Sequence, residues 1–156
     1  MKKNPCLTLL FTLTLFIMSC SSSKNATDLK VNNGNLAGLW TLSDVTVNMP
    51  PDFIITDVFD EAPYEDFKGS KWNLIKNGKG SFTLENGVSK DIYWSVFGKG
   101  ADAQFQFKKL MGEKAREVDT GYRLDIANLS SNGFSATSSL EVGDGKTGTI
   151  TYTFTK

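Results

Sequence analysis

Apolar and polar residues alternate with a period of two over most of this chain, a pattern that predicts β-strands with one buried face. The last segment is the clearest example, because Ile150, Tyr152 and Phe154 share one face while threonines occupy the other. This last predicted strand covers residues 147–155, and the same alternation predicts strands at residues 72–76, 80–85, 90–97, 103–109, 121–129 and 134–142.

Strong turn signals separate these strands. Asn-Gly pairs stand at residues 77–78, 86–87 and 132–133, and glycine-containing triplets stand at 98–100 and 143–145. Such residues readily adopt the positive φ angles that tight hairpins require. Because these connections are short, we expect each strand to lie beside its sequence neighbour in an antiparallel meander.

The first predicted strand, at residues 38–47, changes parity along its length. Trp40 and Leu42 share one side, whereas Val45 and Val47 share the other, and a β-bulge near residues 43–44 would bring all four to one face. No long amphipathic helix is available to cover a flat sheet of such strands. The predicted fold class is therefore all-β, an up-and-down antiparallel meander of about eight strands closed as a barrel.

Two segments lie outside the meander. Residues 48–70 form a long, partly apolar connection, which predicts a lid or plug over a barrel end, with a short helix at residues 60–67 that has Pro63 in its first turn. Residues 110–120 are rich in charge and are compatible with either a helical turn or an extended excursion.

The N-terminal segment has the parts of an export signal, namely Lys2-Lys3, an apolar run at residues 7–18 and a small residue before a cysteine. The stretch Ile17-Met18-Ser19-Cys20 resembles the lipobox of bacterial lipoproteins. This resemblance implies a signal peptide at residues 1–19 and acylation of Cys20, with several chains such as palmitate giving stable membrane anchoring.

After this segment, residues 20–35 are polar and predict a lipid-anchored flexible tether, and residues 36–156 form the predicted barrel domain. The serine that follows Cys20 resembles the outer-membrane sorting pattern of Gram-negative lipoproteins. The expected location is therefore the bacterial cell envelope, lipid-anchored at the outer membrane and facing the periplasm.

Composition limits the chemistry of the folded part. The chain has 17 basic and 17 acidic residues. Removal of Lys2 and Lys3 with the signal peptide would leave a net charge of −2, and this balance does not indicate binding to nucleic acid. The chain has no histidine, and both cysteines, Cys6 and Cys20, precede the predicted domain. We therefore expect no enzyme, no catalytic residue, no cofactor and no metal site. The acidic residues between positions 57 and 66 are more typical of a solvated loop than of a calcium site.

A family resemblance rests on Gly38-Leu39-Trp40 in the first strand, the run at residues 67–74, and Gly121-Tyr122-Arg123-Leu124. With the lipobox and the meander, these features resemble the lipocalin-like lipoproteins of Bacteroidota. The resemblance implies an eight-stranded barrel open at one end, a tryptophan that closes the other, and a small, mostly apolar ligand. Typical members carry an arginine beyond the last strand that packs over the tryptophan. Here Lys156 is the last residue, and Arg123 is a weak substitute because it shares the polar face.

The predicted ligand-binding residues are the large residues expected to face the barrel interior. They are Trp40, Leu42, Phe82, Trp94, Phe105, Phe107, Tyr122, Phe134 and Tyr152. The same residues equally suit a packed core without a cavity. Ala103, Ala136, Ser138 and Gly148 share their parity and are small, so they either leave space for a ligand or accommodate large residues opposite.

Two functions follow from these alternatives. The first is a membrane-anchored binding protein that holds a small hydrophobic ligand in the barrel. The second is a protein-interaction module, such as an inhibitor or an accessory subunit of an envelope complex, with a filled interior and an exposed apolar segment at residues 50–67. An interior space of several hundred Å³ favours the first function, and a solid core with exposed Phe53, Ile54, Ile55 and Phe59 favours the second.

Overall fold

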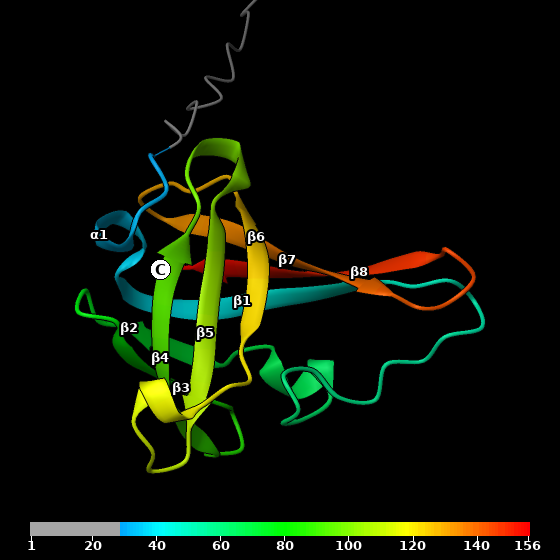
Figure 1. Ribbon diagram of the computed structural model, residues 1–156, viewed down its shortest axis with the longest axis horizontal. Helices are drawn as coiled ribbons and strands as arrows, with labels where there is room; N and C mark the ends of the chain where they lie inside the picture. The colour runs from blue at the N-terminus through cyan, green and yellow to red at the C-terminus, as the bar shows by residue number, and fades with distance from the viewer. Residues whose placement is uncertain (1–28) are drawn as a thin grey trace, which may run out of the picture.

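The structure is a computed structural model that describes residues 29–156, and it is an all-β closed barrel (Figure 1). Each strand pairs antiparallel with the next, and the last strand returns to the first. The strands are β1 (Gly38–Asn48), β2 (Lys71–Leu74), β3 (Lys79–Thr83), β4 (Ser89–Phe97), β5 (Gln104–Leu110), β6 (Tyr122–Ala127), β7 (Gly133–Glu141) and β8 (Thr147–Thr155). The predicted fold class, an eight-stranded meander closed as a barrel, is confirmed.

The local signals behind this prediction act as expected. Gly78 and Gly87, in the turns around β3, have φ angles of 91° and 88°, a region that residues with a side chain rarely adopt. The register between β1 and β8 shifts between Leu42 and Asp44, which places Val45 opposite Tyr152. The bulge therefore turns the second half of β1 so that its valines face the same side as the apolar row of β8.

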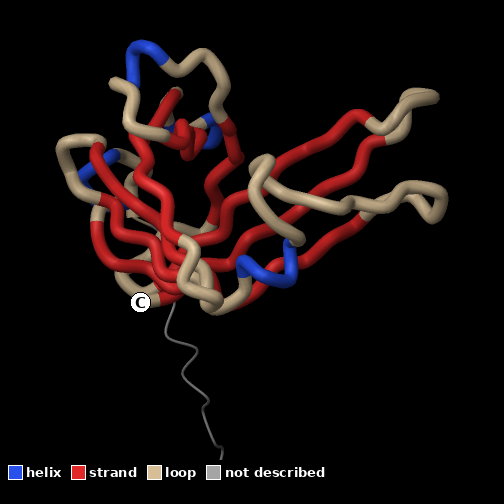
Figure 2. Tube along the Cα trace, turned by 90° about the horizontal axis from the view of Figure 1, so that it is seen from below, coloured by secondary structure: helices blue, strands red, loops and turns tan. Residues whose placement is uncertain are grey.

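The barrel is split on one side. β6 pairs with β7 only where Asp125–Ala127 lie opposite Ser135–Thr137, whereas β7 continues beside β8 as far as Glu141. Beyond Thr137, the ends of β1, β7 and β8 project together from the barrel, as Figures 1 and 2 show. We call this projection the wing; it consists of residues 45–48, 138–141 and 147–150.

A short helix closes the opposite end of the barrel. This helix is α1 (Asn33–Leu36), and its last residue, Leu36, is fully buried. The Trp40 indole Nε1 donates to the Leu36 carbonyl oxygen over 2.8 Å, and the Lys156 Nζ lies 4.5 Å from the Trp40 ring centroid. Lys156 therefore packs over the tryptophan, whereas Arg123 lies 4.3 Å from the Phe97 ring. Arg123 therefore does not pack over Trp40, which agrees with its predicted position on the polar face.

The described chain joins this closed end before the predicted domain begins. The Leu29 N–H donates to the Leu129 carbonyl oxygen over 2.6 Å, and the Asn33 side chain accepts from the Val96 N–H over 2.7 Å. Residues 29–35 thus lie against the barrel, which differs from a free tether extending to residue 35. The predicted signal peptide and Cys20 lie outside the described residues.

The two irregular segments contain 3₁₀ turns rather than α-helices. In the long connection, η1 (Tyr64–Phe67) begins after Pro63, so the helix is shorter than the predicted one at residues 60–67. The excursion after β5 contains η3 (Ala115–Glu117) and bends at residues 111–113, and η2 (Gly100–Asp102) precedes β5. The long connection runs back from the tip of the wing to the open end of the barrel (Figure 2).

Burial of the barrel interior is expected to carry much of the stability. Phe82 is fully buried, whereas Phe97 on the outer wall is 48% exposed. We predict that Phe82→Ala lowers the free energy of unfolding by about 3–5 kcal/mol because it leaves a cavity, as measured by urea denaturation. The matched change Phe97→Ala is expected to cost less than about 1 kcal/mol. Equal losses would show that the predicted inner face does not carry the core.

Candidate ligand site at the open end of the barrel

The predicted ligand-binding residues converge inside the barrel, but most of them contact one another. The eight that are buried, each at most 3% exposed, are Trp40, Leu42, Phe82, Trp94, Phe105, Phe107, Phe134 and Tyr152. Tyr122, the ninth, is half-buried at the open end. The inward orientation follows directly from strand parity.

Aromatic rings fill the body of the barrel. The Trp72 ring stacks on Phe82 at 4.9 Å between centroids and meets the edges of Phe107 at 5.4 Å and Phe154 at 5.6 Å. Towards the closed end, Phe134 stacks on Phe154 at 4.4 Å. In this part of the barrel, the packed-core interpretation of the inward residues holds.

The small residues of the inner face have different neighbours. Ala136 is fully buried within the core. The Met49 sulfur occupies the space that a Cβ atom on Gly148 would need, so this glycine accommodates a large side chain from the long connection. Ser138, by contrast, lies beside open space at the barrel mouth.

Phe59, from the long connection, closes the mouth of the barrel. Its side chain is 8% exposed, and its ring stacks on Tyr152 at 4.9 Å between centroids. The rings that surround it, all within 6.3 Å, belong to Phe67, Trp72, Phe107, Tyr122 and Tyr152. We call residues 58–62 the plug loop, since they carry Phe59 and are joined at their ends by a bridge between Val58 and Ala62.

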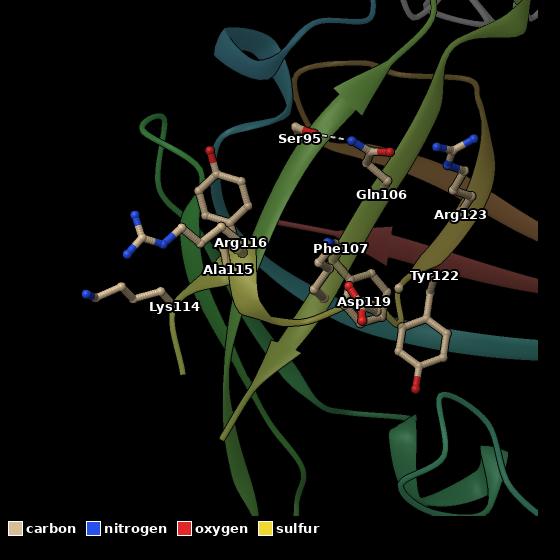
Figure 3. Close-up of a pocket in the computed structure, with 12 residues that line it drawn as sticks. Ser95, Gln106, Phe107, Lys114, Ala115, Arg116, Asp119, Tyr122 and Arg123 are labelled. Atoms are coloured by element: carbon tan, nitrogen blue, oxygen red, sulfur yellow. Dashed lines mark hydrogen bonds between the residues drawn. The ribbon is translucent and has the colours of Figure 1, made fainter. Parts of the chain in front are cut away.

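Polar contacts fasten the plug loop to the barrel rim. The Tyr122 hydroxyl donates to the Phe59 carbonyl oxygen over 2.7 Å and lies 2.9 Å from the Asp60 carboxylate. Lys109 donates to the Asp60 carbonyl oxygen over 2.9 Å. Figure 3 shows the Tyr122 side chain pointing away from the pocket wall towards this loop.

Glu61 makes the strongest electrostatic contact of the loop. Its carboxylate lies 3.0 Å from Lys109 Nζ and 3.1 Å from Lys90 Nζ, and its side chain is 11% exposed. Burial by itself would raise the Glu61 pKa, but the hydrogen bonds and charges of the two ammonium groups outweigh burial and hold this pKa below its ordinary value. Glu61 of the acidic segment thus forms two ion pairs at the rim of the barrel.

A pocket of about 500 Å³ lies beside the plug loop, where β7 diverges from β6. One wall is formed by the long connection, including Ile54, Ile55 and Phe59. The other is formed by β6 and the wing, including Leu124, Leu140 and Ile150. Apolar residues reach this pocket because the inner faces of β7 and β8 continue into the wing beyond the closed barrel, and polar side chains share the wall about equally with them.

The polar part of the pocket wall comes from hydroxyl and charged side chains, which belong to Thr56, Asp57, Asp60, Tyr122, Arg123, Ser138 and Tyr152. Burial raises the pKa of Tyr152, and the Ser138 hydroxyl offsets part of this shift. Burial and the neighbouring Asp60 carboxylate raise the pKa of Tyr122. Both phenols are therefore neutral hydrogen-bonding groups at physiological pH, able to orient a ligand without adding charge.

A second pocket, of about 920 Å³, lies on the outer wall between β4, β5, β6 and the η3 segment (Figure 3). Its wall mixes aromatic and polar side chains, and the Gln106 side chain donates to Ser95 over 2.7 Å. In Figure 3, Lys114 and Arg116 extend to one side and Arg123 lies on the other, so the three charges do not converge on one point. The mouth pocket is the better candidate because inward-facing residues of the barrel and the plug loop line it, whereas the outer pocket lies on the outer wall.

The predicted set of ligand-binding residues lacks several residues of the mouth pocket. The alternation puts Ser138 and Ile150 on the inner face, but it does not distinguish inner residues that line a pocket from inner residues that pack in the core. Phe59 lies in an irregular loop, where alternation carries no information about direction. The available signal was the apolar character of the long connection, which predicted a lid or plug but not which side chain enters the barrel.

Comparisons with protein-family models, curated proteins and solved structures find no match for this chain. The resemblance to lipocalin-like lipoproteins therefore stays a prediction from the residues quoted above. Within residues 29–156, no group of three or more potential metal ligands occurs. No helix in this part of the chain is long and apolar enough to cross a membrane.

The Glu61 ion pairs predict a pH-dependent contribution to stability. A carboxyl whose pKa is lowered on folding stabilises the fold above its unfolded pKa of about 4.5, and this contribution is lost as pH falls through the lower folded pKa. At pH 7 we expect Glu61→Gln to cost about 1–2 kcal/mol in urea denaturation, with the difference disappearing as the pH falls through the lowered pKa of Glu61. Asp52→Asn, in the same connection but exposed, is the control and should cost nothing at pH 7 or at the lower pH.

Proposed function

We propose that this protein is a lipid-anchored binding protein of the bacterial cell envelope that holds a small hydrophobic ligand at the open end of its barrel. The observation that carries the proposal is the mouth pocket, a space of about 500 Å³ whose wall combines apolar side chains with hydroxyl and charged groups. Small-molecule sites commonly have a volume in this range and combine apolar surface with polar groups that orient the ligand. The proposal moves the ligand from the filled barrel body to the mouth.

The direction of the mouth supports an anchored arrangement. Leu29 joins the barrel at its closed end, beside Leu129, whereas the plug loop contacts the opposite ends of β4, β5 and β6. The first described residue is thus fastened at the closed end, and the mouth pocket opens at the other end of the barrel. Binding of a ligand there needs no catalytic residue and no cofactor.

A second candidate function, a protein-interaction module, is favoured by the exposed apolar residues near the wing. Ile54 is 90% exposed, Leu140 is 39% exposed and Phe53 is 36% exposed. In addition, β7 has no partner strand on its β6 side beyond Thr137 among the described residues. An open strand edge beside exposed apolar side chains is a common docking surface for another polypeptide.

A matched pair of substitutions on β7 tests the binding proposal. Ser138 faces the mouth pocket, whereas the adjacent Ser139 is exposed on the opposite face of the strand. We predict that the purified protein binds a fluorescent lipophilic dye saturably, that Ser138→Phe weakens this binding at least tenfold by filling the pocket, and that Ser139→Phe leaves it unchanged. Absence of saturable binding by the unmodified protein would favour the interaction module instead.

Acylation of Cys20 is tested separately in a bacterial host. We expect labelled palmitate to be incorporated into the chain, and the protein to be recovered with the membrane fraction, because several acyl chains give stable anchoring. Cys20→Ser should abolish both results. Cys6→Ser, which changes the other cysteine, should abolish neither, and equal labelling of the two variants would refute the assigned site.

A further inference from the structure

Phe59 separates two spaces that differ in kind. On one side is the mouth pocket, of which Phe59 forms part of the wall, and on the other is the ring-filled body of the barrel. Its ring occupies an aromatic cage at the top of the barrel, stacked on Tyr152 and met edge-on by four other rings. The space that Phe59 fills therefore has the size and surroundings of a binding site for one planar aromatic ring.

The backbone that delivers this ring is strained. Phe59 and Asp60 have φ angles of 56° and 48°, in the left-handed region that residues other than glycine rarely adopt. This conformation is unfavourable for residues that carry a side chain, so packing and side-chain contacts must hold the plug loop in place. Phe59 belongs to a connection rather than a strand, and its withdrawal breaks no pairing between the eight strands.

The same loop also carries a carboxylate that contacts the barrel rim. Glu61, two residues after Phe59, pairs with Lys90 and Lys109 at the rim of the mouth. If the loop withdraws, it leaves an empty aromatic cage together with two ammonium groups and the Tyr122 hydroxyl without their partners. A ligand that carries both a ring and a carboxylate restores both sets of contacts.

We infer that the plug loop is an internal substitute for the ligand, and that the ligand is an aromatic carboxylate. Its ring replaces Phe59 in the cage, its carboxylate replaces Glu61 at Lys90 and Lys109, and the displaced loop lies over the mouth pocket. This inference rests on the proposed function, because it requires a small molecule to enter at the mouth. It deepens that function by naming the ligand class and the segment that competes with it.

The test uses three probes of similar size with the full chain. 3-Phenylpropionate carries the ring and the carboxylate, 3-phenylpropanol carries the ring without the charge, and nonanoate carries the charge without the ring. By isothermal titration calorimetry, we expect the unmodified protein to bind 3-phenylpropionate at least tenfold more tightly than either of the others. Binding should also increase amide hydrogen exchange at Val58 and Glu61, whose N–H groups bond within the plug loop.

Removing the internal ring should favour the ligand. Phe59→Ala is expected to bind 3-phenylpropionate at least about tenfold more tightly than the unmodified protein, because the ligand no longer displaces a competing ring. Nonanoate binding should not gain in this way. Phe134→Ala is the control, since it removes a buried ring at the closed end and should give no such gain.

A second variant covers the case in which Phe59→Ala does not fold. Tyr122→Phe keeps the ring cage but removes the hydroxyl that bonds to Phe59 and Asp60, so the loop opens more easily and affinity for 3-phenylpropionate should rise. Unchanged affinity in whichever of these variants folds, or a preference for nonanoate, would overturn the inference. If the unmodified protein binds the lipophilic dye saturably but gives one of these results, the inference is refuted and the proposed function stands. If the unmodified protein does not bind the dye, both the proposed function and the inference are refuted.

Discussion

Closure of the sheet through β1 and β8 is the constraint on which the rest of the structure depends. It gives every strand two neighbours, so that the apolar faces of all eight strands share one interior. Because of the bulge after Leu42, the apolar side chains in the second half of β1 face the same side as those of β8. The two strands can therefore pair both within the closed barrel and along the wing. Without this shift, the valines of β1 would face the solvent beside the apolar row of β8.

The size of the side chains in this shared interior then determines where a ligand can be held. Three fully buried tryptophans and several phenylalanines leave the body of the barrel occupied by protein. Free space occurs where the barrel is incomplete, at the divergence of β6 from β7, and the long connection covers it from the other side. The candidate site is thus a consequence of a local loss of strand pairing and not of a wide barrel.

The plug loop links the core to this site. Its strained backbone is unfavourable by itself, yet it places an aromatic ring in a cage of rings and a carboxylate between two lysines. Such a segment is stable only while both sets of contacts persist, and this property is typical of elements that exchange with ligands. The closed end shows the opposite arrangement, in which α1, Trp40 and Lys156 stabilise one another without a strained segment.

The sequence by itself determined the strands, their order, their inner faces and the bulge, because alternation and turn chemistry act over a few neighbouring residues. Eight of the nine residues assigned to the interior, such as Phe82 and Tyr152, are buried for this reason. Only the tertiary structure decided that these rings fill the barrel, that Phe59 enters its mouth, and that Lys156 rather than Arg123 packs over Trp40. These contacts join segments far apart in the chain through irregular loops, where no periodicity records the direction of a side chain.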